Sequence, residues 1–530
     1  MRILENIINK FLTKVTFNYA EIHYKFKYSF SLYNMNEPEI IFDAPYRLSP
    51  NQSLPISLII KDAHLFPIDI KEIKILGPND ELLFEFKENI PINKLLFYKI
   101  ISINSDKLSK YINQKITITP KIKYEINGKI KTAITHNFKQ TSHSPLEIFI
   151  ASENFPLSNK FLWSDLHIHS FFTHDQVEFG APIEAIAKTA QAIGLNNIAV
   201  TDHSYDLDDE MGEYYKPDKN LTRWKNLKKD SEKYSTENLS ILFGEEVSCG
   251  NKKNQNVHFL VINDEKFIAG NGDSAEKWFK NKPTHLCKKI IETADKNSLL
   301  ISAHPNEKVP IFQKFLLRRG AWSFSQEKPL NGFQIMNGVV NKRLGKSIKL
   351  WTKQLLKGEK LFIYAGNDSH GNFNNFRQIK APMISLNEKD SQLLGKHRTG
   401  IISKNSKSDI LKSLKNGKCF ITNSFSIDLK IINEFGEIFE LGETANGKNL
   451  EIKTQCLSNN EFGKIENLKI YFGDLAKQKE EIIFEKNIND FNYSHTLNLQ
   501  NSGNGYIRAE IKSGKNKKIK IAITNPIWVG

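Results

Sequence analysis

Apolar and polar residues alternate with a period of two near both ends of the chain. Between residues 20 and 150 the pattern is clearest in KITITPKIKYEI, where one parity is shared by Ile116, Ile118, Ile122, Tyr124 and Ile126. That period places the apolar side chains on one face of a β-strand. Turn signals at GPND and NGK are spaced as in an antiparallel sandwich. We therefore predict an Ig-like β-sandwich over 20–150, after a short amphipathic helix over 1–19.

The last hundred residues repeat the alternation. It is seen in YIRAEIK, with Ile507, Ala509 and Ile511, and in KIKIAIT, with Ile519, Ile521 and Ile523. The pattern predicts a second β-sandwich domain over 401–530.

The middle of the chain, residues 160–400, differs because short apolar strands alternate with helical stretches. Pro182 and Gly194 suit the first turn and the end of one helix, APIEAIAKTAQAIG, and NKRLGKSIKLWTKQLLKG predicts another. The seven strand candidates are LWSDLHI, NIAVTDH, SILFGEEV, VHFLVI, LLISAHP, GFQIMNG and LFIYAGND. Such alternation is typical of a mostly parallel sheet or barrel.

Charge and composition narrow the function classes. The net charge of +15 comes from 74 basic and 59 acidic residues, but only nine of the basic residues are arginine and the lysines are dispersed. Nucleic-acid binders concentrate positive charge and use arginine for bidentate contacts, so this pattern argues against such a partner. The longest apolar runs are far shorter than the ~20 residues of a membrane-crossing helix.

The N-terminus and the cysteines bear on compartment. Polar residues interrupt MRILENIINKFLTKVTF where a signal peptide needs an unbroken apolar core, so we expect a cytoplasmic protein. The four cysteines stand far apart in sequence without CxxC spacing, which predicts buried reduced thiols rather than a zinc knuckle or redox pair.

Histidines gather at the ends of the predicted middle strands. Of 14 histidines, eight fall between 167 and 370. His167 and His169 are two apart, so on a strand both imidazoles point the same way and can bind one metal ion. The second to fifth strands contribute Asp202 with His203, Glu246, His258 and His304, the sixth ends in Asn337, and the seventh is followed by Asp368 and His370.

A single histidine beside a strand is more often a hydrogen-bonded structural residue. A buried cluster of so many titratable groups is different, because without compensation it costs on the order of several kcal/mol per ion. Cations supply that compensation, and the ligand number exceeds the needs of one four-coordinate ion. We therefore expect two or three divalent ions, with zinc, manganese and iron all suited to mixed nitrogen and oxygen ligands.

The motifs DLHIHS, TDHS, GEEVS, NVHF, SAHP and GNDSHG, in this order over residues 165–380, resemble those of the PHP family, named from polymerase and histidinol phosphatase. The resemblance implies a distorted (β/α)7 TIM-like barrel, flanked here by the two sandwiches, with a trinuclear metal centre that hydrolyses phosphoesters. It implies a bridging role for Glu246, and a role in orienting imidazoles for Asp165 and Asp202. The implied ligands are His167, His169, His203, Glu246, His258, His304, Asp368 and His370.

Two positions within these motifs leave a choice. The family places a further ligand seven or eight residues after the first motif histidine, where both His174 and Asp175 stand, and the spacing favours Asp175. In GEEV the G-x-E pattern selects Glu246, which leaves Glu245 for the surface or a salt bridge.

The flanking segments GKCFITNS, AITNPIWV and GNDSHGNFNNFRQI resemble the CehA/McbA-type branch of the family, some members of which are linked to carbamate hydrolysis. This resemblance bears on the substrate and leaves the metal chemistry unchanged.

These features predict a metal-dependent phosphoesterase acting on a small molecule. Its nucleophile would be a hydroxide bridging two metal ions, with Glu246 and Asp368 as catalytic ligands. Arg377 is our first choice to bind the phosphate oxygens, ahead of Arg318 and Arg319, and a surface salt bridge is the alternative for each. The rival functions are a carbamate or carboxylic ester hydrolase on the same centre and a non-catalytic, metal-stabilised binding protein. The sequence does not predict an oligomeric state.

Overall fold

The computed structural model describes most of the chain from residue 37 onward. The described residues are 37–138, 143–173, 180–213, 216–270, 282–305, 309, 314, 317–322, 330–338, 340, 342–374, 378–381, 384–387, 392–500, 503–514 and 519–530. The helix expected over 1–19 lies outside them. Within them, every helix is too short or too polar to cross a membrane.

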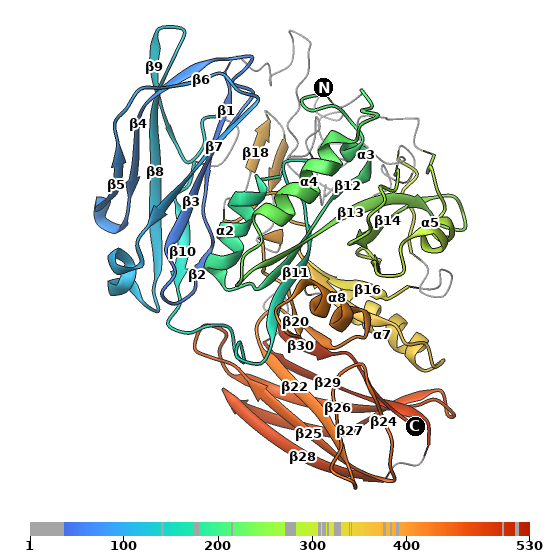
Figure 1. The fold of residues 1–530 in the computed structure, drawn as a ribbon. Helices are drawn as coiled ribbons and strands as arrows, with labels where there is room; N and C mark the ends of the chain where they lie inside the picture. Colours follow the sequence, from blue (N-terminus) through green and yellow to red (C-terminus); the bar gives the residue numbers. More distant parts are fainter. Residues whose placement is uncertain are drawn as a thin grey trace, which may run out of the picture.

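Residues 39–150 form two facing β-sheets, drawn in blue to teal in Figure 1. One sheet has the order β1-β3-β7, and the other has β2-β10-β8-β4-β5 with β6 and β9 at its margins. The alternation seen in the sequence is real here, because every second residue of β8 is buried. The elements are β1 (Glu39–Asp43), β2 (Arg47–Leu48), β3 (Leu54–Lys61), β4 (Ile68–Leu76), η1 (Pro78–Asp80), β5 (Leu82–Phe86), β6 (Ile90–Ile92), β7 (Leu96–Ile103), η2 (Ser105–Tyr111), β8 (Lys115–Ile126), β9 (Lys129–Ile134) and β10 (Leu146–Ile150). We call residues 37–150 the N-terminal module.

The seven strands expected in the middle of the chain are all present, and they lie side by side in chain order. They are β11 (Leu162–Ile168), β12 (Asn197–His203), β13 (Ser240–Gly250), β14 (Asn256–Ile262), β15 (Leu299–Ser302), β16 (Gly332–Asn337) and β17 (Phe362–Gly366). The described helices around them are α2 (Ile183–Ile193), α3 (Ser204–Leu207), α4 (Thr222–Lys233), α5 (Cys287–Thr293) and α7 (Lys342–Leu355).

The predicted (β/α)7 TIM-like barrel is nevertheless wrong. β14 runs antiparallel to both β13 and β15, whereas a (β/α) barrel is parallel throughout. The length of the connection explains why β14 is antiparallel to β13. Residues 251–255, which join the two strands, are too short a segment for the crossover that parallel neighbours require. The sheet also stays open: in the part of the chain that the structure describes, β17 and β11 share no ladder, and an isolated bridge joins Ile168 of β11 to Ser369 in the loop after β17. The result is a curled, mixed sheet.

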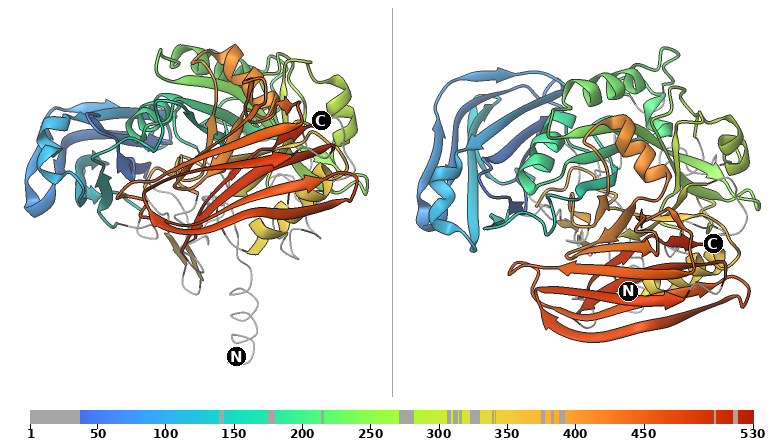
Figure 2. Two further views of the ribbon diagram at one scale, coloured as in Figure 1. Left: turned by 90° about the horizontal axis from the view of Figure 1, so that it is seen from below. Right: turned by 60° about the horizontal axis from the view of Figure 1, so that its bottom comes forward.

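The outer edge of β11 is paired instead with β20, and through it the sheet continues into the C-terminal part of the chain. Beyond β11 the order is β20-β21-β30-β29-β26-β27, and these six strands, the seven middle strands, β24 and β31 make one sheet of 15 strands. The order β23-β22-β25-β28 makes a facing sheet of four. The remaining elements are β18 (Gln378–Ala381), β19 (Ile384–Asn387), β20 (Arg398–Ile401), α8 (Lys407–Lys415), β21 (Cys419–Thr422), β22 (Ser426–Asn433), β23 (Ile438–Phe439), β24 (Thr444–Ala445), β25 (Asn449–Leu457), β26 (Ile465–Asp474), β27 (Lys479–Asp490), β28 (Asn492–Gln500), β29 (Gly505–Ser513), β30 (Lys520–Thr524) and β31 (Ile527–Val529). Figure 2 shows this C-terminal sandwich and the N-terminal module on different sides of the central sheet.

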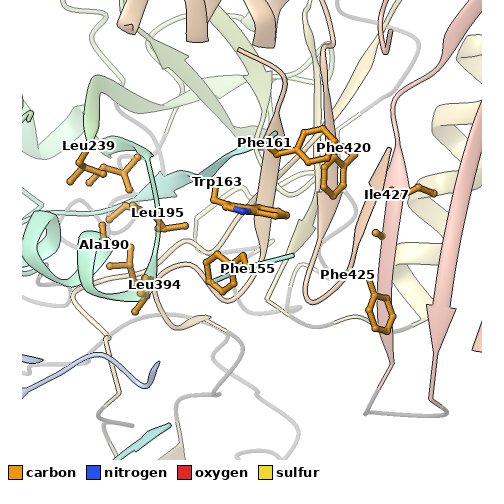
Figure 3. Close-up of a cluster of buried hydrophobic side chains, with 14 of the residues drawn as sticks. Phe155, Phe161, Trp163, Ala190, Leu195, Leu239, Leu394, Phe420, Phe425 and Ile427 are labelled. Atoms are coloured by element: carbon orange, nitrogen blue, oxygen red, sulfur yellow. The ribbon is translucent and has the colours of Figure 1, made fainter. Parts of the chain in front are cut away.

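A hydrophobic cluster joins the central sheet to the C-terminal sandwich. Trp163 of β11 is fully buried and meets the ring of Phe420 of β21 edge-on, with 5.7 Å between the ring centroids. Phe155 packs on the other side of Trp163 at 5.6 Å (Figure 3). The same cluster continues to Ile427 of β22, so the two parts share one core.

Two cysteines that are distant in sequence are neighbours in the structure. The Sγ atoms of Cys249, in β13, and Cys287, at the start of α5, lie 3.0 Å apart, and both residues are buried and not joined by a disulfide. The sequence spacing gave no sign of this pair, because α5 returns to β13 only through the tertiary fold.

Candidate metal centre

The eight implied ligands that the motifs select come together at one end of the central sheet. All eight side chains are buried, with exposed fractions of 9% or less. Their donor atoms form three groups, in each of which the atoms lie within 4.8 Å of one another. The groups are His169 with His203 and His370; His167 with His169, Glu246 and Asp368; and Glu246 with His258 and His304.

Glu246, on β13, lies at the centre of the cluster. Its Oε1 atom is 2.7 Å from Nδ1 of His258 and 3.1 Å from Nε2 of His304. Its Oε2 atom is 3.1 Å from Nδ1 of His203 and 3.5 Å from Nε2 of both His167 and His169. The two oxygens of one carboxylate therefore face different histidines, which is the geometry that a bridging ligand requires.

The backbone delivers Asp368 and His304 in an unusual conformation. Both lie in the left-handed region, with φ of 55° and 29° respectively. Such backbone strain in non-glycine residues is concentrated at functional sites. Gly366, at the end of β17, is required for a different reason, since a Cβ atom there would lie 2.6 Å from the Cβ of His167. The absence of a side chain allows β17 to approach β11 at the cluster.

The carboxylates and histidines of the cluster shift one another's pKa values. Burial favours the neutral form of His167, but the carboxylates of Asp368 and Glu246 outweigh it and raise the His167 pKa to about 9. Burial also acts on Glu246, yet the positive field of His258 and His167 holds the Glu246 pKa well below its usual range. The pKa of His169 is lowered well below normal by burial and by the neighbouring His370 and His203. His169 is therefore neutral, the form in which an imidazole binds metal.

Asp165 and Asp202 are buried beside the cluster, but their carboxylates accept hydrogen bonds from backbone N–H groups rather than from the imidazole rings. Asp202 accepts hydrogen bonds from the backbone N–H groups of Ser170 at 2.6 Å and Thr173 at 3.1 Å. Asp165 accepts from the backbone of His167 at 3.3 Å and from the backbone and side chain of Asn367 at 3.1 and 2.7 Å. They thus fix the chain on either side of the ligands.

The imidazoles are oriented by groups that the sequence analysis missed. Nδ1 of His167 donates to Oε1 of Gln334, 2.9 Å away, which turns Nε2 of His167 towards Glu246 and Asp368. Nδ1 of His370 donates to the backbone oxygen of Asp368 at 3.1 Å. Tyr205 stacks on the ring of His203 with 4.7 Å between centroids. Gln334 had one signal in the sequence, as a polar residue inside the apolar strand GFQIMN.

Other predicted residues are placed differently or lie outside the described residues. Glu245, expected at the surface or in a salt bridge, is fully buried, accepts a hydrogen bond from the N–H of Ile268 at 2.9 Å, and has its pKa raised well above normal by that burial. Arg319 is buried, and its Nη1 contacts Nε2 of His258. His174, Asp175 and Arg377 are among the residues that the structure does not describe, so the choice between the first two stays open.

The donor set fits divalent cations. Six imidazoles and two carboxylates offer nitrogen and oxygen ligands of the kinds that zinc, manganese and iron accept. Within the described residues, Oδ2 of the buried Asp368 accepts no hydrogen bond, although burial of a carboxylate oxygen without a partner is costly. A cation at the second group would satisfy it.

Comparisons with known proteins leave the family undecided. No protein-family model matches the chain, and no curated protein matches it. Similar solved structures include beta-glucuronidase from Parabacteroides merdae, with 8% identity, 93% of this chain and 64% of that chain covered, and a TM-score of 0.20. Another is beta-D-mannosidase from Dictyoglomus thermophilum, with 7% identity, 97% and 72% covered, and a TM-score of 0.23. The chain thus spans less than two thirds of the glucuronidase. Scores this low support no inference about fold or function.

Proposed function

We propose that this protein is a metal-dependent hydrolase that acts on phosphoesters. The observation that carries the proposal is the position of Glu246, whose two carboxylate oxygens face histidines belonging to different donor groups. The proposal rests on this side-chain geometry and on the order of the motifs that resemble the PHP family, and it does not need a closed barrel.

Each donor group would hold one ion. Bound divalent cations would supply Lewis acidity and an activated water at neutral pH. The chain's own contribution is to hold the ligands in place. Gln334 and the backbone oxygen of Asp368 fix the rings of His167 and His370. Glu246 would be a ligand shared between neighbouring donor groups.

Arg319 favours a phosphoester over a neutral ester. Its guanidinium lies against His258, at the edge of the third donor group. His304, in the same group, and Arg319 are each 9% exposed, more than the other ligands of the site. A fixed cation there would bind the non-bridging oxygens of a phosphoryl group, which a carbamate or carboxylic ester lacks.

Two measurements test the proposal. Elemental analysis of the purified protein should find two or three divalent ions per chain, and a metal-free protein would overturn it. Hydrolysis of p-nitrophenyl phosphate, bis-p-nitrophenyl phosphate and p-nitrophenyl acetate should then be compared with added Mn²⁺ or Zn²⁺ and after chelation. Metal-dependent turnover of either phosphate supports a phosphoesterase. Turnover of the acetate alone indicates an ester or carbamate hydrolase. If the metal-loaded protein hydrolyses none of the three compounds, it is a binding protein.

A further inference from the structure

The loop that follows β17 carries two members of the metal cluster, Asp368 and His370, and is held from two sides. On one side it is tied to β11, because the N–H of Asp368 donates to the oxygen of His167 at 2.9 Å and the N–H of His169 donates to the oxygen of Ser369 at 2.8 Å. These contacts place the first residues of the loop beside the histidines of β11.

On its other side the loop is held by the N-terminal module. The backbone N–H of Phe373 donates to Oδ2 of Asp43, at the end of β1, over 2.9 Å. The N–H of Tyr46 donates to the backbone oxygen of Phe373 at 3.1 Å. The side-chain amide of Asn374 donates to the backbone oxygen of Glu147, in β10, at 2.6 Å. Three hydrogen bonds, from the end of β1, from the connection between β1 and β2, and from β10, therefore converge on two consecutive loop residues.

Asp43 is well suited to fix the loop. Its side chain is 2% exposed, and its Oδ1 atom accepts from the N–H of Ala44 at 2.8 Å, so one carboxylate joins the module's own backbone to that of Phe373. Hydrogen bonds to an ionised acceptor are shorter and about twice as strong as neutral ones. The strand that carries it is part of a sheet, since Asp43 pairs with Ser57 in the β1–β3 ladder.

We propose that the N-terminal module is an integral part of the metal centre, and that Asp43 is a positioning residue that sets Asp368 and His370 for metal binding. This inference rests on the proposed function, because it assumes that those two residues bind ions. It gives the module a role beyond packing: two of the three donor groups include a residue of the held loop. The third group, Glu246 with His258 and His304, contains none.

The test is metal titration of the chelator-treated full chain with Mn²⁺ or Co²⁺. Asp43→Ala should weaken binding at two of three sites by about 10- to 100-fold, as loss of a ligand's supporting hydrogen bonds does. Binding at the third site should be unchanged. Asp43→Asn keeps one oxygen acceptor and the side-chain volume, so its metal affinity should lie between those of Asp43→Ala and the unmodified protein. If the alanine variant does not fold, the asparagine variant is used for the titration instead.

The matched control is Glu39→Gln. Glu39 lies on the same strand, is equally buried, and contacts Lys61 at 2.9 Å and His136 at 3.0 Å. The substitution Glu39→Gln should lower the stability of the N-terminal module without changing the metal affinity of the protein. Hydrogen exchange of the metal-free protein gives a second readout, in which the amide of Phe373 should exchange at least tenfold faster in the Asp43 variants than in Glu39→Gln.

The outcomes separate this inference from the proposed function. If the unmodified protein binds no metal, the proposed function fails and this inference fails with it. If the unmodified protein binds its ions but both Asp43 variants match it in metal affinity and in exchange at Phe373, only the positioning role is overturned. Equal losses at all three sites, or an equal loss in Glu39→Gln, would show general destabilisation and would also overturn it.

Discussion

Oε1 of Glu246 lies 2.7 Å from Nδ1 of His258, and both groups are buried. The partner oxygen of the same carboxylate faces the histidines of β11 and β12. One side chain therefore connects donors from several strands of the central sheet, and its substitution should affect more than one ion.

Glu246→Gln should remove one or two ions per chain and reduce any phosphatase activity by at least about 1,000-fold, because an amide is a far weaker bridging ligand. Elemental analysis and p-nitrophenyl phosphate turnover measure both effects. The adjacent Glu245→Gln is the control. Burial raises the pKa of Glu245 and so favours its neutral form, which glutamine resembles, and the glutamine oxygen can still accept from the N–H of Ile268. Full metal content in Glu246→Gln would refute the bridging role.

Metal affinity should rise with pH through the titration of His167. Its pKa of about 9 in the metal-free fold lies above the ordinary value of 6.5. Protonated His167 therefore stabilises the metal-free fold below pH 6.5, and that contribution is lost as pH rises towards 9. Because a metal ion must displace the proton, affinity at the second donor group should increase about tenfold per pH unit between 7 and 9. Calorimetry in buffers of different ionisation enthalpy should detect the released proton, and a pH-independent affinity over this range would contradict the assignment.

Gln334→Leu should weaken metal binding by about 10- to 100-fold, because His167 loses the acceptor that orients its ring. Gln334→Glu retains an oxygen acceptor and should bind metal more tightly than the leucine variant. Metal titration followed by visible absorption of Co²⁺ measures the difference. Equal affinities for the leucine variant and the unmodified protein would mean that packing alone holds the ring.

Trp163→Ala should destabilise the fold by about 3–5 kcal/mol, the usual cost of truncating a fully buried aromatic residue. Since the shared core still contains Phe161, Phe420 and Ile427 after this change, the central and C-terminal parts should still unfold together in one transition. Denaturant unfolding monitored by fluorescence and circular dichroism checks both points. Two separated transitions in the unmodified protein would show that the shared core does not couple them.

The positions of the strands and of the clustered side chains could be predicted from the sequence, because both depend on local patterns. The period of two marks β8 correctly, and each of the seven middle strands was located by its apolar run. The structure brings the donor atoms of these side chains into groups, with His258 contributed from near the start of the reversed strand β14.

Strand direction and long-range contacts could not be read from those patterns. An apolar run has the same composition whether it is parallel or antiparallel to its neighbour, so the reversal of β14 was missed. Gln334 forms a hydrogen bond with His167, which is 167 positions away in the sequence, and Asp43 forms one with Phe373, which is 330 positions away. No spacing within the sequence encodes such partners. The prediction of a surface position or salt bridge for Glu245 is wrong for a similar reason, since its burial depends on the segment that contains Ile268.

The ladder between β11 and β20 has a practical consequence for anyone who wishes to divide the chain. A truncation before Arg398 would strip the histidine-bearing strand of its neighbour at Leu162, Trp163 and Ser164. Unpaired strand edges recruit other chains, so such a fragment should self-associate rather than fold as an isolated unit.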